Sequence, residues 1–134
     1  MRRSSLGILF ATVLLACSAD TITDDLSSYG GDYTLRSVNG FPLPYAIQKT
    51  TAITLEILDE TFSLTSSGSF VDITHYRRTQ NPIVDFPGDT LRGTYTVRGQ
   101  TANFTTTAGD VFSGTMGTGQ FSIEGTSAVL LYQR

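Results

Sequence analysis

The chain has 134 residues, which is enough for one domain with one hydrophobic core, and its formal net charge is −3 at pH 7. Lysine and arginine number 9 against 12 acidic residues, so we expect no nucleic-acid partner, because phosphate binding needs clustered basic side chains. The single cysteine and the single histidine cannot supply the three or four ligands of a zinc site, so the sequence predicts neither a metal nor a cofactor.

The first segment, MRRSS, is basic and precedes eleven mostly apolar residues, LGILFATVLLA, that end at Cys17. A membrane-spanning helix needs about 20 apolar residues, so this run is too short to be one. A basic start, a short apolar run and a small residue at the cleavage point are typical of a secretory signal peptide. We therefore expect residues 1–16 to be removed, which leaves 7 basic residues (9 minus Arg2 and Arg3) against 12 acidic ones.

Cys17 has no second cysteine to pair with, so a disulfide within a monomer is excluded. The end of a signal peptide also lacks the ordered surroundings that a buried or catalytic thiol needs. The residues Leu14, Leu15, Ala16 and Cys17 resemble the lipobox of bacterial lipoproteins. The resemblance implies a diacylglyceryl thioether on Cys17, carrying fatty acids such as palmitate, and two or three acyl chains hold a protein firmly to a membrane. The alternative is a secreted protein with ordinary cleavage.

The residue after the acceptor is Ser18, where an Asp would resemble the inner-membrane retention signal of many Gram-negative lipoproteins. The resemblance therefore implies a cell-envelope protein anchored to the outer membrane and facing the periplasm. Residues 18–30, SADTITDDLSSYG, are polar and acidic without a sustained period. We expect residues 17–30 to be a lipidated N-terminus and flexible tether with a mean reach of about 20 Å.

Residues 31–134 show short alternating runs separated by Gly, Asn, Asp, Ser or Pro, which predicts antiparallel strands with one polar face. The expected strands are 32–38, 50–58, 61–66, 69–79, 90–98, 100–107, 110–116, 119–124 and 127–133. Most links are too short to join anything but antiparallel neighbours, and Asp59-Glu60 is one of these expected turns. Most strand aromatics are expected in the core: Tyr33, Phe62, Phe70, Tyr95, Phe104, Phe112, Phe121 and Tyr132.

The sequence thus predicts an all-β domain, an antiparallel up-and-down meander that closes into an eight- or nine-stranded barrel. Gly93 and Gly114 lie inside expected strands and mark bends. The segments YTLRSVNGFPLP, GTY and LLYQR, in this layout, resemble the small lipocalin-like domains of bacterial lipoproteins. Compared with full lipocalins the chain is shorter, has Tyr33 where a tryptophan is expected and lacks a C-terminal helix, so the resemblance does not imply a deep cavity.

Two long proline-containing links, 39–49 and 80–89, are the candidate functional loops, because loops on a rigid scaffold carry binding more often than the scaffold does. The candidate ligand-binding residues lie in these loops or beside them: Phe41, Tyr45, Phe86, Tyr76 and Arg78. We expect a small apolar or amphipathic ligand in the barrel mouth. The alternative is a protein-interaction or inhibitor module of the envelope, with a solid barrel core.

No catalytic residue is predicted, and we expect a non-enzymatic protein. Serines are plentiful, but no Gly-x-Ser-x-Gly motif occurs and His75 is the single imidazole that could activate one. His75 is expected to be a partly solvated residue near a strand end. The acidic pair Asp59-Glu60 is expected to be solvated in its turn, and Asp85 with Asp89 could flank a cation or a sugar.

Overall fold

The computed structural model describes residues 24–134, and Cys17 and the predicted signal peptide lie outside the described residues. The described part forms one antiparallel sheet of eleven strands, preceded by a short 3-10 helix. In chain order the elements are η1 (Leu26–Ser28), β1 (Gly31–Val38), β2 (Phe41–Pro42), β3 (Tyr45–Lys49), β4 (Thr54–Leu64), β5 (Ser69–Gln80), β6 (Ile83–Asp85), β7 (Gly88–Arg98), β8 (Thr101–Thr106), β9 (Val111–Gly117), β10 (Gln120–Glu124) and β11 (Val129–Gln133).

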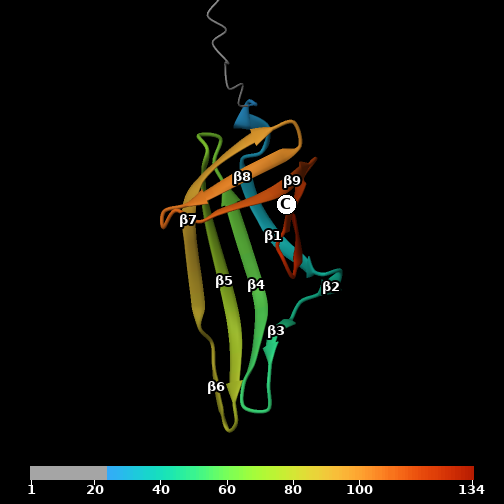
Figure 1. Cartoon of the computed structure of the whole chain (residues 1–134), viewed down its shortest axis with the longest axis vertical. Coiled ribbons are helices and arrows are strands. Elements are labelled where there is room, and N and C mark those ends of the chain that lie inside the picture. The colour runs from blue at the N-terminus through green and yellow to red at the C-terminus, as the bar shows by residue number, and fades with distance from the viewer. Residues whose placement is uncertain (1–23) are drawn as a thin grey trace, which may run out of the picture.

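The sheet closes into a barrel because β1 pairs on one side with β11 and on the other with β4. Around the barrel the order is β1-β11-β10-β9-β8-β7-β5-β4, with antiparallel pairing throughout, and chain neighbours lie side by side (Figure 1). Closure removes the exposed strand edges that an open sheet would leave. The predicted up-and-down, lipocalin-like barrel is confirmed, and it has eight strands.

The predicted turn at Asp59-Glu60 is wrong, because β4 is one continuous strand where two were expected. Its pairing with β5 runs from Thr54 to Leu64, with a register shift between Ile57 and Asp59. A bulge at this point inserts one residue and reverses the alternation of side chains along the strand. Ile57 faces the interior before the bulge and Glu60 faces it afterwards, while Asp59 is exposed.

The three strands outside the barrel lie in the segments predicted as loops. β3 pairs with the first residues of β4, and β6 pairs with the last residues of β5. The start of β4 and the end of β5 therefore extend together past the end of the barrel, with β3 and β6 at their sides (Figure 1). We call this end of the barrel the mouth. The connections β1–β2, β5–β7, β8–β9 and β10–β11 all lie at this end of the barrel.

The opposite end is covered by residues 24–30, which the sequence assigned to the tether. The backbone N–H of Asp24 donates to the carbonyl of Val97 at 3.0 Å, and its carboxylate accepts from the N–H of Gly99 at 2.7 Å. Leu26 packs partly buried against the core. These residues belong structurally to the barrel, and we call this the closed end.

Arg134, at the other end of the described chain, binds residues 28–30 of this segment. Its guanidinium donates to the carbonyl oxygens of Gly30 at 2.8 Å and Ser28 at 3.2 Å. The guanidinium carbon also lies 5.4 Å from the centre of the Tyr33 ring, a cation–π distance. The two ends of the described chain therefore meet at the closed end.

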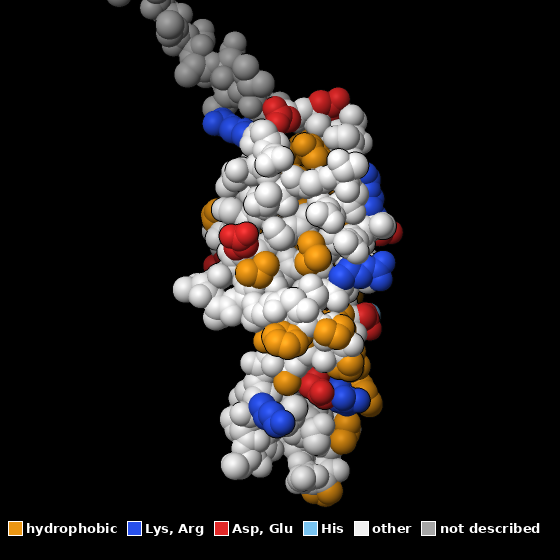
Figure 2. Space-filling view, turned by 90° about the vertical axis from the view of Figure 1, so that its right-hand side faces the viewer, with side chains coloured by type: hydrophobic (Ala, Val, Ile, Leu, Met, Phe, Trp, Pro, Cys, Tyr) orange, Lys and Arg blue, Asp and Glu red, His pale blue; other side chains and the backbone are white. Residues whose placement is uncertain are grey.

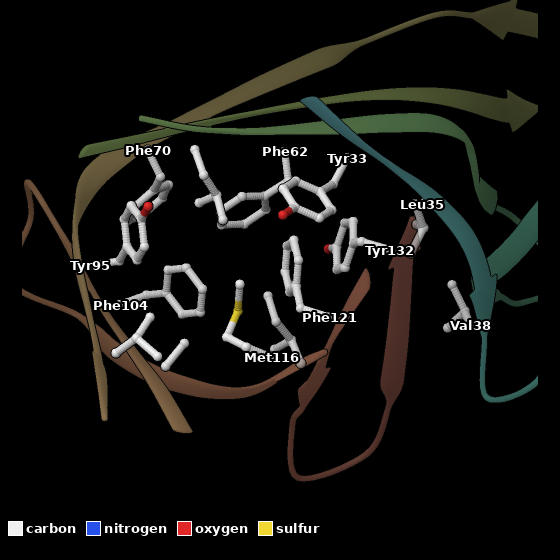
Figure 3. Packing of buried hydrophobic residues seen from close by; sticks show 14 of the residues in the cluster. Tyr33, Leu35, Val38, Phe62, Phe70, Tyr95, Phe104, Met116, Phe121 and Tyr132 are labelled. Atoms are coloured by element: carbon white, nitrogen blue, oxygen red, sulfur yellow. The ribbon is translucent and has the colours of Figure 1, made fainter. Parts of the chain in front are cut away.

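The barrel interior next to the closed end is filled by aromatic rings that project from opposite walls (Figure 3). Phe104 is fully buried, and its ring centre lies 5.3 Å from that of Phe62 and 5.6 Å from that of Phe70. Such edge-to-face pairs add about 0.5–1.5 kcal/mol each beyond the burial of their surface. All the aromatics predicted as core pack in this cluster, with Phe112 only partly buried at its margin.

Gly93 and Gly114, which the sequence predicted as bends, lie where neighbouring barrel strands approach closely. A Cβ on Gly93 would lie 2.0 Å from the carbonyl oxygen of Thr105, and one on Gly114 would lie 2.5 Å from that of Ser122. Real Cβ atoms do not approach a backbone oxygen so closely, so any side chain there would push the strands apart.

Candidate functional site

A cavity of about 300 Å³ lies inside the mouth end of the barrel, beyond the aromatic core. Six barrel strands contribute to its wall: β4, β5, β7, β9, β10 and β11. Part of the wall is apolar, formed mainly by Ile57, Leu91, Phe112, Ile123 and Leu130. A concave site with an apolar wall and a few convergent polar groups is the usual form of a small-molecule site.

The polar part of the wall is acidic and lies mainly on β4 and β5. Glu60 is only 5% exposed, and the Tyr132 hydroxyl donates a hydrogen bond to its Oε1. Asp72 is on the neighbouring strand and faces the same interior, because Phe62 pairs with Asp72 and Glu60 pairs with Thr74. The Oδ1 atom of Asp72 is buried and has no hydrogen-bond partner.

Burial raises the pKa of both carboxyls in this pair. For Asp72 burial is the largest cause and the adjacent Glu60 the next, and together they raise the pKa to about 8. For Glu60 burial also raises the pKa, against the hydrogen bond from Tyr132, which lowers it. The same burial, reinforced by the charge of Glu60, raises the pKa of the Tyr132 hydroxyl. At neutral pH the pair therefore retains a proton that two exposed carboxylates would have released.

Asp89 on β7 is a third carboxyl group at the cavity, opposite Thr74 in the β5–β7 register. It is more exposed than the buried pair, and its Oδ1 accepts from the N–H of Thr90 at 2.8 Å. No lysine, arginine or histidine is among the residues described as lining this cavity. The wall therefore carries acidic groups with no cationic side chain to balance them.

The nearest cationic side chains on β5 are engaged elsewhere. Arg77 donates to Glu56 at 2.8 Å, and Arg78 donates through Nε to Asp85 at 2.9 Å and through a second nitrogen to the other oxygen of that carboxylate. Asp85 is thus neutralised by Arg78 and does not join Asp89 as the proposed pair of loop carboxylates. The pKa of Asp85 is lowered by this hydrogen bond.

Of the ligand-binding residues expected from the sequence, Tyr76 lines the cavity. Phe41 and Tyr45 are stacked, with ring centres 6.4 Å apart, and Phe41 is exposed on β2. Phe86 is 69% exposed in the β6–β7 connection, and Arg78 points to Asp85. The structure brings these residues to the mouth end of the molecule, but only Tyr76 to the cavity.

The residues that the sequence interpretation missed are Glu60, Asp72 and Tyr132. Glu60 was assigned to a turn, and Tyr132 was expected only as a core ring. A signal for Asp72 does exist, because strand alternation places it on the same face of β5 as Phe70, which is buried.

His75 lies on the outer face of the barrel, where its Nδ1 is 2.6 Å from Oδ1 of Asp59. Both side chains are more than half exposed, as expected for a partly solvated histidine. Neither side chain lines the cavity.

A second hollow of about 350 Å³ lies on the outside of the barrel, where β7 passes between β5 and β8. It is lined largely by backbone and by threonine side chains around Gly93, and Arg92 is the one charged residue described there. This hollow gathers no group of convergent polar side chains comparable to the cavity in the mouth.

Within residues 24–134, no three His, Cys, Asp or Glu side chains lie close enough together to hold a metal ion. The same residues contain no helix of the length and apolar character needed to cross a membrane.

Comparisons of the chain with protein-family models, with curated proteins and with solved structures find no match. The site is therefore interpreted from its own geometry and chemistry.

Proposed function

We propose that this protein is a non-enzymatic binding barrel of the cell envelope that takes up a small amphipathic ligand in its mouth. The observation that carries the proposal is the cavity of about 300 Å³ beyond the aromatic core. The ring cluster separates this cavity from the closed end. An apolar wall formed by residues such as Phe112 and Leu130 suits the hydrocarbon part of a ligand, and the Glu60–Asp72 side suits a polar group.

Binding is favoured over catalysis by the position of the single imidazole. His75 points outward and is engaged with Asp59, so it does not face the cavity in which a ligand would lie. The cavity offers hydrogen-bonding and acidic groups, which suit the polar part of a bound ligand.

A cavity-filling variant tests this proposal. Leu130 lines the cavity, so Leu130→Trp should fill part of it and remove co-purifying ligand detected by native mass spectrometry. The matched control is Ile83→Trp, because Ile83 is an exposed side chain on β6 that does not line the cavity. Equal ligand occupancy in the wild type and Leu130→Trp, with both variants folded, would refute a ligand in this cavity.

The envelope location is supported by the sequence of residues 1–18 and is proposed with the lipid on Cys17, which lies outside the described residues. We expect labelled palmitate to be incorporated into the wild type and not into Cys17→Ser, and the wild type to fractionate with the outer membrane. Palmitate labelling of the Cys17→Ser variant would place the lipid on another residue, and a wild type without label would refute the anchor. This experiment is independent of the cavity variants.

Protein interaction is the second candidate function, and the exposed apolar side chains near the mouth favour it. Figure 2 views the side of β2 and β3, where hydrophobic side chains gather over the middle and lower part of the face. Phe41 and Ile47 are exposed on these strands, and Ile83 and Val84 are exposed on β6. If this surface contacts an envelope protein, Phe41→Ser should abolish cross-linking to that protein and leave ligand occupancy of the cavity unchanged.

A further inference from the structure

The polar wall of the cavity carries an unbalanced negative charge. Glu60, Asp72 and Asp89 converge on it from β4, β5 and β7, and no basic side chain is among its described lining residues. One of these oxygens, Asp72 Oδ1, is buried without a hydrogen-bond partner. A ligand that supplies a donor there would satisfy this oxygen.

The barrel cannot supply that donor from its own cationic side chains. Arg77 is held by Glu56 and Arg78 by Asp85, both in ion pairs that do not line the cavity. Lys49 lies exposed on β3, and His75 faces outward to Asp59. None of these four side chains lines the cavity.

Without such a charge, the buried pair holds a proton. Burial and the neighbouring Glu60 raise the pKa of Asp72 to about 8, and burial also raises the pKa of Glu60. A proton therefore occupies the place of a cation near neutral pH. A ligand that brings its own positive charge would displace this proton.

We infer that the ligand carries a single ammonium group, which lies between Glu60 and Asp72 with Asp89 at the rim, while its hydrocarbon part packs on Leu91, Phe112 and Leu130. This inference rests on the proposed function and specifies the chemistry of the same cavity. An ammonium group presents up to three N–H donors, which suits two carboxyls and a Tyr hydroxyl better than a single alcohol does. The ring of Tyr76, which also lines the cavity, offers further attraction to a cation.

A carboxylate ligand would face like charges in this cavity, and a neutral ligand would leave the acidic wall unbalanced. An inorganic divalent cation lacks a set of three suitably placed ligands within the described residues. A small alkylamine is the simplest molecule that combines the required charge with a hydrocarbon chain.

The test compares n-hexylamine, 1-hexanol and hexanoate by titration calorimetry. The protein is the mature chain, residues 17–134, carrying Cys17→Ser, so that it has neither the signal peptide nor the lipid. We expect hexylamine to bind at least about tenfold more tightly than hexanol at pH 7.5, and hexanoate to bind more weakly than both. Because one proton leaves when the amine enters, its dissociation constant should fall by up to about tenfold per pH unit between pH 6 and pH 8 and then level off.

The variant Asp72→Asn should weaken hexylamine binding by about tenfold or more, remove most of its pH dependence and change hexanol binding much less. Asp89→Asn keeps the buried pair and should cause a smaller loss, so it carries the test if Asp72→Asn does not fold. The control is Asp110→Asn, an exposed carboxylate that does not line the cavity, which should bind all three probes as the wild type does.

The outcomes separate this inference from the proposed function. Equal binding of hexylamine and hexanol without pH dependence, tighter binding of hexanoate, or binding of Ca²⁺ alone would overturn the ammonium assignment and leave the ligand cavity intact. Binding of no probe, together with unchanged occupancy of native ligand in Leu130→Trp, would overturn the cavity itself and the inference with it.

Discussion

Replacing Asp72 by Asn should change the pH dependence of the stability of the barrel. The pKa of this carboxyl is about 8 in the folded protein, against 3.8 for a free side chain. The folded state therefore binds more protons than the unfolded chain between these two values. The free energy of unfolding of the wild type should fall as the pH rises through this window, and the proton-linked stability is fully present below it.

The size of the effect follows from the shift. At about 1.4 kcal/mol per pH unit the full shift would be worth about 6 kcal/mol. The cavity opens at the mouth, and water that enters it lowers the cost of ionisation, so we expect the wild type to lose about 2–4 kcal/mol between pH 5 and pH 8.5. The amide in Asp72→Asn cannot ionise, so the variant should lose less than half as much over the same range.

Urea unfolding followed by tyrosine fluorescence, at pH 5, 7 and 8.5, measures this difference. The control is Asp32→Asn, which removes an exposed carboxylate near the closed end, where it accepts from the Ser63 hydroxyl at 2.6 Å. It leaves the buried pair intact and should show the wild-type slope. Parallel stability curves for the wild type and Asp72→Asn would refute the explanation, because the pH dependence would then arise elsewhere.

Three further variants probe the scaffold. Gly93→Ala should lower the melting temperature by several degrees or prevent folding, because its Cβ would lie 2.0 Å from a backbone oxygen, whereas Gly88→Ala meets nothing closer than 3.5 Å and should be nearly neutral. Phe104→Leu should cost about 1–3 kcal/mol in urea unfolding, since this fully buried ring contacts several others; a cost below about 0.5 kcal/mol would contradict the packing. Arg134→Ala should speed hydrogen exchange of the Asp24 amide, with no change in the β4–β5 amides.

The strand pattern could be predicted from the sequence where polar and apolar residues alternate without interruption. In β7, Tyr95 and Val97 are buried and Arg98 is exposed, as period two predicts. The same signal placed the hairpin turns correctly at Ser67-Gly68 and Gly99. The local sequence is sufficient to predict these strands and turns, because the alternation of side chains between the two faces of a strand is visible within a few residues of the chain.

The prediction failed at Asp59-Glu60 because a change of alternation has two physical causes that look alike in a sequence. Apolar residues occupy odd positions through Ile57 and even positions from Phe62 onward, which is compatible with a turn between two strands or with a bulge inside one. The register with β5 decides for the bulge, and a register involves a second strand. A single-strand pattern does not contain this information.

The acidic pair could not be found from the sequence for a related reason. Glu60 and Tyr132 are 72 residues apart, and their hydrogen bond forms only when β11 closes the barrel beside β1. Buried carboxyls are rare, so composition favours placing them in solvent. Only the closed barrel turns one face of β4 and one face of β5 into the wall of a cavity.

Asp24 and Arg134 both lie at the closed end, and this has a practical consequence. An affinity tag or a fluorescent reporter joined after Arg134 would stand on the far side of the molecule from the mouth, so ligand uptake can be followed in fusions of this kind.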